Sequence, residues 1–286
     1  MIYYHADDYG INPKQSKRIL SCRKNGPLNS VSILPTSDHL GETIPLLDPE
    51  CKKSVHINLC EGRALSDPKS ISMLANGEGC FYNSFGAMLI KSVFFGKELE
   101  KQVEKECYAQ ISRIGEYLPE DYKLRLDSHR HYHMIPRVFR GLLKAAFRTG
   151  REIEYIRFPM ESPGLYLSIP RLWSRISPLS IIKALVLNTL GSYNKLYLRK
   201  CGLSDRTLGY IGVVFTDRMF YENIAPLVEL INSGKFFKGQ DVEVQFHPGK
   251  VKRGEPLHET RFANWYSSIN RDKEAAALKR FAEDIK

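Results

Sequence analysis

The chain carries the stretch Tyr122-Lys123-Leu124-Arg125-Leu126-Asp127-Ser128-His129-Arg130-His131-Tyr132-His133, which places four metal-competent side chains at every second position. Residues 122–126 alternate apolar with polar side chains and predict a β-strand. Because alternate residues of a strand point to one face, Asp127 and the three histidines are expected to converge at or just beyond the strand end. Imidazole and carboxylate groups gathered in this way can bind a divalent cation. The alternative is a His-rich surface turn.

Short strands alternate with helical patterns along the rest of the chain. Further strands are predicted at residues 2–6, 31–34, 54–59, 154–158, 210–215 and 242–246, and helices at residues 13–25, 99–118, 136–149 and 224–231. About seven strands, mostly separated by helices, predict parallel βα units and an α/β fold. The order of the strands does not follow from the pattern. A (β/α) barrel and a doubly wound sheet therefore both fit.

The chemically active residues outside the His-rich stretch also lie in or at the ends of predicted strands, where α/β barrels build their active sites. Asp7 and Asp8 follow the first strand, and because adjacent carboxylates repel each other they need a cation or a shared proton. His56, Arg157 and His247 lie in or just after three other strands. Taken singly, these residues fit a capping turn, a core histidine or a structural ion pair. Taken together, they predict metal-assisted hydrolysis.

Two segments depart from the alternating pattern. Residues 64–97 contain Gly, Ser and aromatic residues without a clear period and predict a loop insertion over the site. Residues 162–204 contain no Asp or Glu and mix apolar with cationic side chains. An apolar, cationic segment of this kind is expected to pack over the barrel mouth or against a second subunit, or to lie on a membrane surface. A helical pair that only covers the barrel's own core is the alternative.

Composition narrows the class of protein. With 286 residues and 43% hydrophobic content, the chain can bury a large core, and one barrel-sized domain over residues 1–286 is expected. The net charge of +10 favours anionic partners, although a mildly basic cytosolic enzyme is the better account of the charge taken alone. Six scattered cysteines without CxxC spacing predict free thiols in a reducing compartment. The first residues show no secretory-signal pattern.

Five motifs occur in order along the chain and together resemble the YdjC-like carbohydrate deacetylase family, which includes chitooligosaccharide- and hopanoid-type deacetylases. The motifs are His5-Ala6-Asp7-Asp8-Tyr9-Gly10, Val55-His56-Ile57-Asn58-Leu59, Asp127-Ser128-His129-Arg130-His131-Tyr132-His133, Arg157-Phe158-Pro159-Met160-Glu161 and Phe246-His247-Pro248-Gly249. The resemblance implies a deformed TIM-like barrel that removes the acetyl group from N-acetylated amino sugars or oligosaccharides.

The resemblance also implies roles for individual residues. Asp8, His56 and His129 would hold one divalent metal ion, either Mg²⁺ or Zn²⁺. Asp7 would be the catalytic base and His247, which normally titrates near neutral pH, the acid. The residues expected to contact or surround the substrate are Arg157, His131, His133 and Glu161.

Two other classes of function also fit the sequence. One is a basic, metal-stabilised protein that binds glycans or membranes without turnover, and the other is a metal-dependent phosphoesterase. The expected partner is an N-acetylated saccharide, with a homodimer or a membrane-surface contact through residues 162–204 as further expectations and no nucleic acid. The expected location is cytoplasmic or peripheral to the inner face of the membrane.

Overall fold

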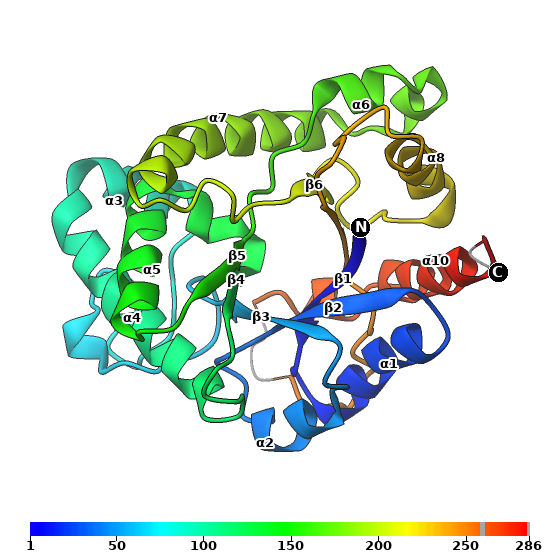
Figure 1. The fold of residues 1–286 in the computed structure, drawn as a ribbon. Coiled ribbons are helices and arrows are strands. Elements are labelled where there is room, and N and C mark those ends of the chain that lie inside the picture. The colour runs from blue at the N-terminus through cyan, green and yellow to red at the C-terminus, as the bar shows by residue number, and fades with distance from the viewer. Residues whose placement is uncertain (258–260, 285–286) are drawn as a thin grey trace.

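Seven parallel strands form one curled sheet at the centre of the molecule (Figure 1). The structure is a computed structural model, and it describes residues 1–257 and 261–284. The strands lie in the order β5-β4-β3-β2-β1-β7-β6. Their bounds are Ile2–Tyr9 (β1), Leu28–Ile33 (β2), Lys52–Ile57 (β3), Leu124–Ser128 (β4), Ile153–Ile156 (β5), Gly209–Ile211 (β6) and Val242–Phe246 (β7). All seven predicted strands are therefore present.

The curled sheet confirms the predicted deformed barrel and excludes the doubly wound alternative. β5 and β6 are the two edges of the sheet. The backbone N–H of Ile156 on β5 nevertheless donates to the carbonyl of Arg206, just before β6, with 2.8 Å between the two atoms. The two edges thus approach each other without forming a full strand pair, and the sheet is a half-barrel that is almost closed.

Helices cover the outside of the sheet (Figure 1). Their bounds are Pro13–Lys24 (α1), Leu40–Thr43 (α2), Phe85–Phe94 (α3), Gly96–Gly115 (α4), Pro136–Arg148 (α5), Pro163–Leu167 (α6), Pro178–Lys200 (α7), Tyr221–Asn232 (α8), Ala263–Tyr266 (α9) and Asn270–Asp284 (α10). Short 3-10 turns occupy Ile44–Leu46 (η1), Pro68–Ser70 (η2), His129–Met134 (η3) and Pro170–Arg175 (η4).

Local sequence explains where several helices begin and how they pack. Asn12 caps α1 by accepting a hydrogen bond from the Gln15 amide at 2.8 Å, and Pro13 occupies the first helical position. The apolar face predicted for residues 99–118 is buried along α4 as far as Ile114, whereas Leu118 lies beyond the end of the helix. α5 packs closely against it, because Gly141 lies where a Cβ would come within 2.7 Å of the Glu100 carbonyl.

The prediction of a loop over residues 64–97 was wrong in one respect. The segment contains η2 and the regular helix α3, which Ser84 caps by accepting a hydrogen bond from the Ala87 amide at 3.2 Å. α3 was missed because apolar residues lie on both its faces, so the sequence shows no helical period. Val93 and Phe94, for example, are 70% and 74% exposed.

Residues 162–204 form α6, η4 and the long helix α7, which lies along one side of the barrel mouth (Figure 1). α7 is anchored by Asn194, whose side-chain amide donates to the Met134 carbonyl at 2.8 Å, and by Gly191, which packs against Met160. Among the described residues, no helix has both the length and the apolar character needed to cross a bilayer.

Candidate active site

Asp7 and Asp8 owe their positions to an irregularity near the end of β1. The pairing of β1 with β2 shifts register between Ala6 and Tyr9, and Asp8 has a φ of 64°. Neighbouring residues of a regular strand point to opposite faces, but a bulge can re-aim a side chain. Both carboxylates consequently approach one atom, His56 Nε2, at 3.9 Å from Asp7 and 3.5 Å from Asp8.

Asp8, His56 and His129 form a cluster with the donor atoms of a metal site. Asp8 Oδ1 lies 3.0 Å from His129 Nδ1 and 3.5 Å from His56 Nε2. Asp8 Oδ1 and His56 Nε2 are buried and have no hydrogen-bond partner within the described part of the chain. Because unpaired buried polar atoms are costly, a cation between these three side chains would satisfy them.

The other nitrogen of each imidazole is held by a carboxylate. His56 Nδ1 donates to Asp127 Oδ1 at 2.5 Å, and His129 Nε2 lies 2.9 Å from Glu61 Oε1. In neutral imidazoles these contacts turn the lone pairs of the opposite nitrogens toward Asp8. Carboxylate partners of this kind fix the tautomer and orientation of metal-binding histidines. Arg271 holds the second Asp8 oxygen at 2.5 Å.

The electrostatics of the cluster favour positive charge. Burial lowers the pKa of His56, but the Asp7 and Asp127 carboxylates outweigh this effect and raise it to about 10. Burial opposes protonation of His129 as well, yet the Asp8 carboxylate raises its pKa. The side chains therefore fit the divalent ion that the sequence predicts.

Asp7 is held in one orientation by a buried arginine. Arg157 donates to both Asp7 oxygens, at 2.9 and 2.8 Å, and the Gln245 side-chain amide also donates to Asp7. Burial would raise the pKa of Asp7, but the Arg157 and His56 charges hold it well below its usual range. Asp7 is therefore ionised over the neutral pH range.

A second cluster of potential ligands, His5, Asp7 and Asp127, lies beside the first. The Arg157 guanidinium already supplies a cation here, since it also contacts Asp127 Oδ2 at 3.2 Å and Glu243 Oε1 at 2.5 Å. A metal ion would have to displace this fully buried side chain. The cluster around Asp8 is thus the better metal site.

The four alternating side chains do not share one strand face as the sequence predicted. β4 ends at Ser128, and Arg130 and His131 in the following turn have left-handed φ values of 55° and 60°. His131 lines the pocket described below. His133 turns into the core, where its ring nitrogens contact Ser128 Oγ at 2.6 Å and the Arg157 carbonyl at 2.8 Å.

Two of the residues expected to contact substrate lie elsewhere. Arg157 is buried behind Asp7, as the structural ion-pair alternative predicted. Glu161 accepts hydrogen bonds from the backbone amides of residues 212–214 and lines a different cavity. Both ring nitrogens of His133 contact other groups in the core. Of the four residues expected to contact or surround the substrate, His131 is therefore the one that faces the candidate site.

His247 lies beside Asp7. Its Nε2 is 3.9 Å from Asp7 Oδ2 and 3.2 Å from the Gln245 side-chain nitrogen, and its ring packs edge-on against Trp265. Burial lowers the pKa of His247 to about 3, against the opposing effect of the Asp8 and Asp7 carboxylates. The expectation that it titrates near neutral pH was therefore wrong, because the ring is enclosed.

Asp7, His129 and His247 line a pocket of about 500 Å³, which is within the range of small-molecule sites. Its wall combines the site with residues of η3, α7 and the segment after β7. The lining residues are Asp7, Phe85, His129, Arg130, His131, Tyr132, Lys183, Val186, Leu187, Thr216, Gln245, His247 and Trp265.

Several residues that support the site were not singled out from the sequence. Glu61 follows the His56 motif closely, and its position soon after a strand end was a usable signal. Gln245 is two residues before His247 and thus on the same strand face. Arg271 and Glu274 belong to α10, where no local pattern distinguishes them from surface charges. Glu274 accepts a hydrogen bond from the His247 amide at 2.5 Å.

A family model described as YdjC-like protein matches residues 1–282. The chain belongs to this family. The match covers the Asp8, His56 and His129 cluster together with its supports, so the fold and the resemblance seen in the five motifs agree.

Curated relatives carry related names. The carbohydrate deacetylase of Danio rerio is 29% identical over 162 residues, which cover 56% of this chain and 50% of that protein. The carbohydrate deacetylase of Thermoanaerobacter pseudethanolicus is 26% identical over 50% of this chain and 55% of that protein. The chitooligosaccharide deacetylase of Yersinia pestis is 24% identical over 60% and 65%. The chain spans about half the length of the first two relatives.

One solved structure is similar over nearly the whole chain. It is described as a candidate cellobiose-phosphate cleavage protein from Enterococcus faecalis V583. The superposition has a TM-score of 0.67 and covers 99% of this chain and 93% of the other, with 18% sequence identity. The likeness at this identity is one of fold.

Proposed function

We propose that this chain is a metal-dependent hydrolase that removes the acetyl group from an N-acetylated amino sugar, oligosaccharide or glycolipid. The observation that carries the proposal is the buried cluster of Asp8, His56 and His129, which meets a 500 Å³ pocket at His129 and at the ionised Asp7 beside it. Membership of the YdjC-like family, and relatives named carbohydrate deacetylases, point to the same reaction.

Asp8, His56 and His129 would hold one divalent ion. Two imidazoles and one carboxylate suit Zn²⁺ or another transition metal by ligand type, and Mg²⁺ is the alternative. When bound, the ion polarises the acetyl carbonyl and lowers the pKa of water. Asp127, Glu61 and Arg271 orient the three ligands through the contacts described above.

Asp7 is the proposed base. It is ionised, and Arg157 fixes both of its oxygens, so it can accept a proton from a water molecule in the pocket without reorienting. A carboxylate with a lowered pKa is a weak base by itself. Its activity as a base would therefore depend on the acidity that a cation held by Asp8, His56 and His129 would give to the water.

His247 is the proposed proton donor to the leaving amine. Burial keeps the His247 ring neutral before the reaction, so the ring must receive a proton before it can donate one. Asp7 is the nearby source, since its Oδ2 lies 3.9 Å from His247 Nε2. Gln245 lies between the two groups, with contacts to both. The proton removed from water would thus pass from Asp7 to His247 and on to the amine nitrogen. His131 and Trp265, which line the same pocket, are proposed to contact the sugar.

Acetate release tests this proposal. The purified, metal-loaded protein should release one acetate per amine formed from members of a panel of N-acetylated saccharides. Release of phosphate from sugar phosphates without acetate release would instead support a phosphoesterase. Tight saccharide binding without either product would support a binding protein. A homodimer and a cytoplasmic or membrane-peripheral location remain proposals that sedimentation and cell fractionation can test.

A further inference from the structure

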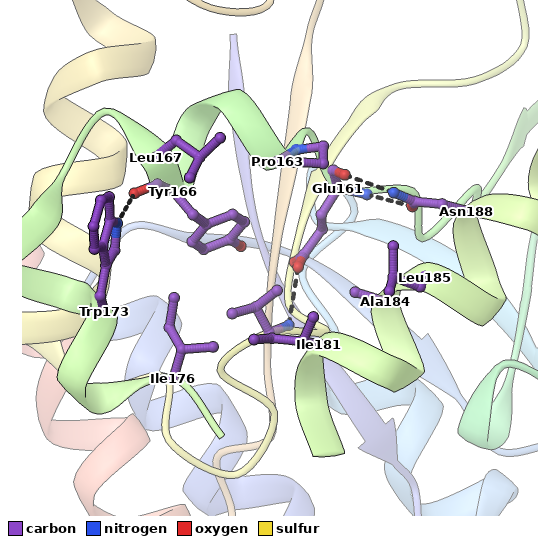
Figure 2. Close-up of a pocket in the computed structure, with 11 residues that line it drawn as sticks. Glu161, Pro163, Tyr166, Leu167, Trp173, Ile176, Ile181, Ala184, Leu185 and Asn188 are labelled. Atoms are coloured by element: carbon purple, nitrogen blue, oxygen red, sulfur yellow. Dashed lines mark hydrogen bonds between the residues drawn. The ribbon is translucent and has the colours of Figure 1, made fainter. Parts of the chain in front are cut away.

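A second cavity of about 310 Å³ lies outside the candidate active site, between α6, η4 and α7. Figure 2 shows the Tyr166 ring pointing into it, with Trp173 and Ile176 on one wall and Ala184 and Leu185 on the other. The proposed reaction uses none of these side chains. The cavity is large enough for part of a small ligand.

Most polar groups that border this cavity are satisfied within the protein, and the exception is the buried Tyr166 hydroxyl, which has no hydrogen-bond partner in the described part of the chain. The Glu161 carboxylate accepts hydrogen bonds from the backbone amides of residues 212–214, and the Asn188 side chain pairs with the Glu161 backbone in both directions, at 3.0 and 2.9 Å. The Trp173 indole donates to the Tyr166 carbonyl at 3.0 Å. Apart from the Tyr166 hydroxyl, what remains for a ligand is apolar surface, so the cavity suits a mainly apolar ligand.

The rim of the cavity exposes large apolar side chains to solvent. Leu167 is 63% exposed, Trp173 52%, Ile181 47% and Leu185 56%. On ordinary protein surfaces, large exposed apolar side chains are scattered singly. Several of them gathered at the mouth of an apolar cavity usually mark a binding site.

Helix α7 forms a wall common to this cavity and to the candidate active site. Ala184, Leu185 and Asn188 face the cavity, whereas Lys183 and Val186 face the 500 Å³ pocket. A helix with its side chains is about 10 Å across. One extended molecule can therefore reach both hollows by crossing the exposed surface of α7.

Charge indicates what kind of molecule crosses α7. Residues 162–204 contain no carboxylate side chain. Lys183 and Arg130 both line the active-site pocket, and among the described residues neither forms an ion pair with a carboxylate. A second copy of this basic segment would face like charge. An amphiphile with an anionic or polar linkage and an apolar chain complements it.

We propose that the 310 Å³ cavity binds the hydrocarbon chain of an amphiphilic substrate whose N-acetylated sugar occupies the pocket on the other side of α7. The inference rests on the proposed deacetylase function for the sugar end. The chain-binding end is independent of catalysis and can be measured separately.

Two N-acetylglucosaminides that differ in the aglycone, methyl and dodecyl, test the proposal with the full-length, metal-loaded protein. The dodecyl compound should have a KM at least tenfold below that of the methyl compound. Ala184→Phe, which fills the cavity, should remove this difference. The matched control Leu196→Phe, on an exposed site of the same helix outside the cavity, should preserve it. Equal KM values in the wild type, or a difference that survives Ala184→Phe, would overturn the proposal.

Direct binding of the fluorescent fatty acid cis-parinaric acid tests chain binding in the cavity separately from deacetylation of the sugar. We expect saturable binding that Ala184→Phe abolishes and Leu196→Phe retains. This result is expected even if neither glycoside is deacetylated. Failure of deacetylation would then refute the proposed function but not the chain-binding cavity. Chain binding without any KM advantage would assign the cavity to a free lipid and refute a substrate chain. Absence of binding, with a dimer in sedimentation that Ala184→Phe dissociates, would assign it to a second copy.

Discussion

At the scale of single residues, the candidate site depends on side chains that a regular strand could not bring together. Asp8, Arg130 and His131 adopt left-handed backbone conformations, which residues other than glycine rarely do. The residue types of the site were predictable from the sequence, because Asp and His recur at strand ends. Their directions were not, because the alternating pattern of residues 127–133 gives no sign of a left-handed turn at Arg130.

The three proposed metal ligands give the first prediction. Asp8→Ala or His129→Ala should lower the bound divalent metal by an order of magnitude or more, because each change removes one of three donors. Elemental analysis of the purified variants measures this. His39→Ala, a histidine outside the site, serves as the control and should keep its metal. Full metal occupancy in both site variants would exclude the assignment.

The proton path gives the second prediction. Asp7→Asn should keep the fold and the metal but lower kcat by roughly a hundredfold or more, the usual scale for a general base. The neutral amide can still accept from Arg157, whose charge retains Asp127 and Glu243 as partners. His247→Ala should lower kcat similarly. A variant that deacetylates at the wild-type rate would show that its residue is not in the path.

His133 predicts how stability changes with pH. Burial lowers its pKa to about 4, so the unfolded chain, with a pKa near 6.5, binds a proton at higher pH than the folded protein. Its contribution is therefore present above pH 6.5 and is lost as the pH falls from 6.5 to 4, on the order of 3 kcal/mol in total. In urea unfolding between pH 6.5 and 4, the slope of the unfolding free energy against pH reports the protons taken up on unfolding. In His133→Gln this number should fall by up to one proton. An unchanged slope would contradict this.

At the scale of elements, the strands were predictable and several helices were not, α3 among them. Each strand is a short apolar run bounded by turn residues, and this local signal survives folding. α3 has apolar residues on its exposed face as well as its buried one, so its period is hidden. β4 was expected to extend its alternation into the histidines, but the chain turns into η3 at His129.

The contact between α4 and α5 gives a prediction at this scale. Gly141→Ala places a methyl group 2.7 Å from the Glu100 carbonyl and against Val103, and should lower the free energy of unfolding by about 1–3 kcal/mol. Gly86→Ala in α3 meets no atom within 4 Å and should be neutral or slightly stabilising. Equal denaturation midpoints for the two variants would show that the helices can separate without cost.

At the scale of the whole molecule, the site joins residues from both ends of the chain. Arg271 donates a hydrogen bond to Asp8, which lies 263 positions earlier in the chain. Glu61, which follows β3, contacts His129 in η3. Sequence patterns identify what lies at one strand end, but they carry no information on which distant side chain completes it. The supporting residues were therefore missed even though the family resemblance implies which residues are the metal ligands.

Acetate production tests the central claim most directly. The metal-loaded wild type, the same protein after chelation and dialysis, and the metal-loaded Asp7→Asn variant are incubated with N-acetylated chitooligosaccharides, and acetate and free amine are counted together. The account predicts equal amounts of the two products from the wild type, loss of both after chelation with recovery on adding Zn²⁺ or Mg²⁺, and a roughly hundredfold slower rate for the variant. Undiminished acetate release from the chelated protein or from Asp7→Asn would contradict it.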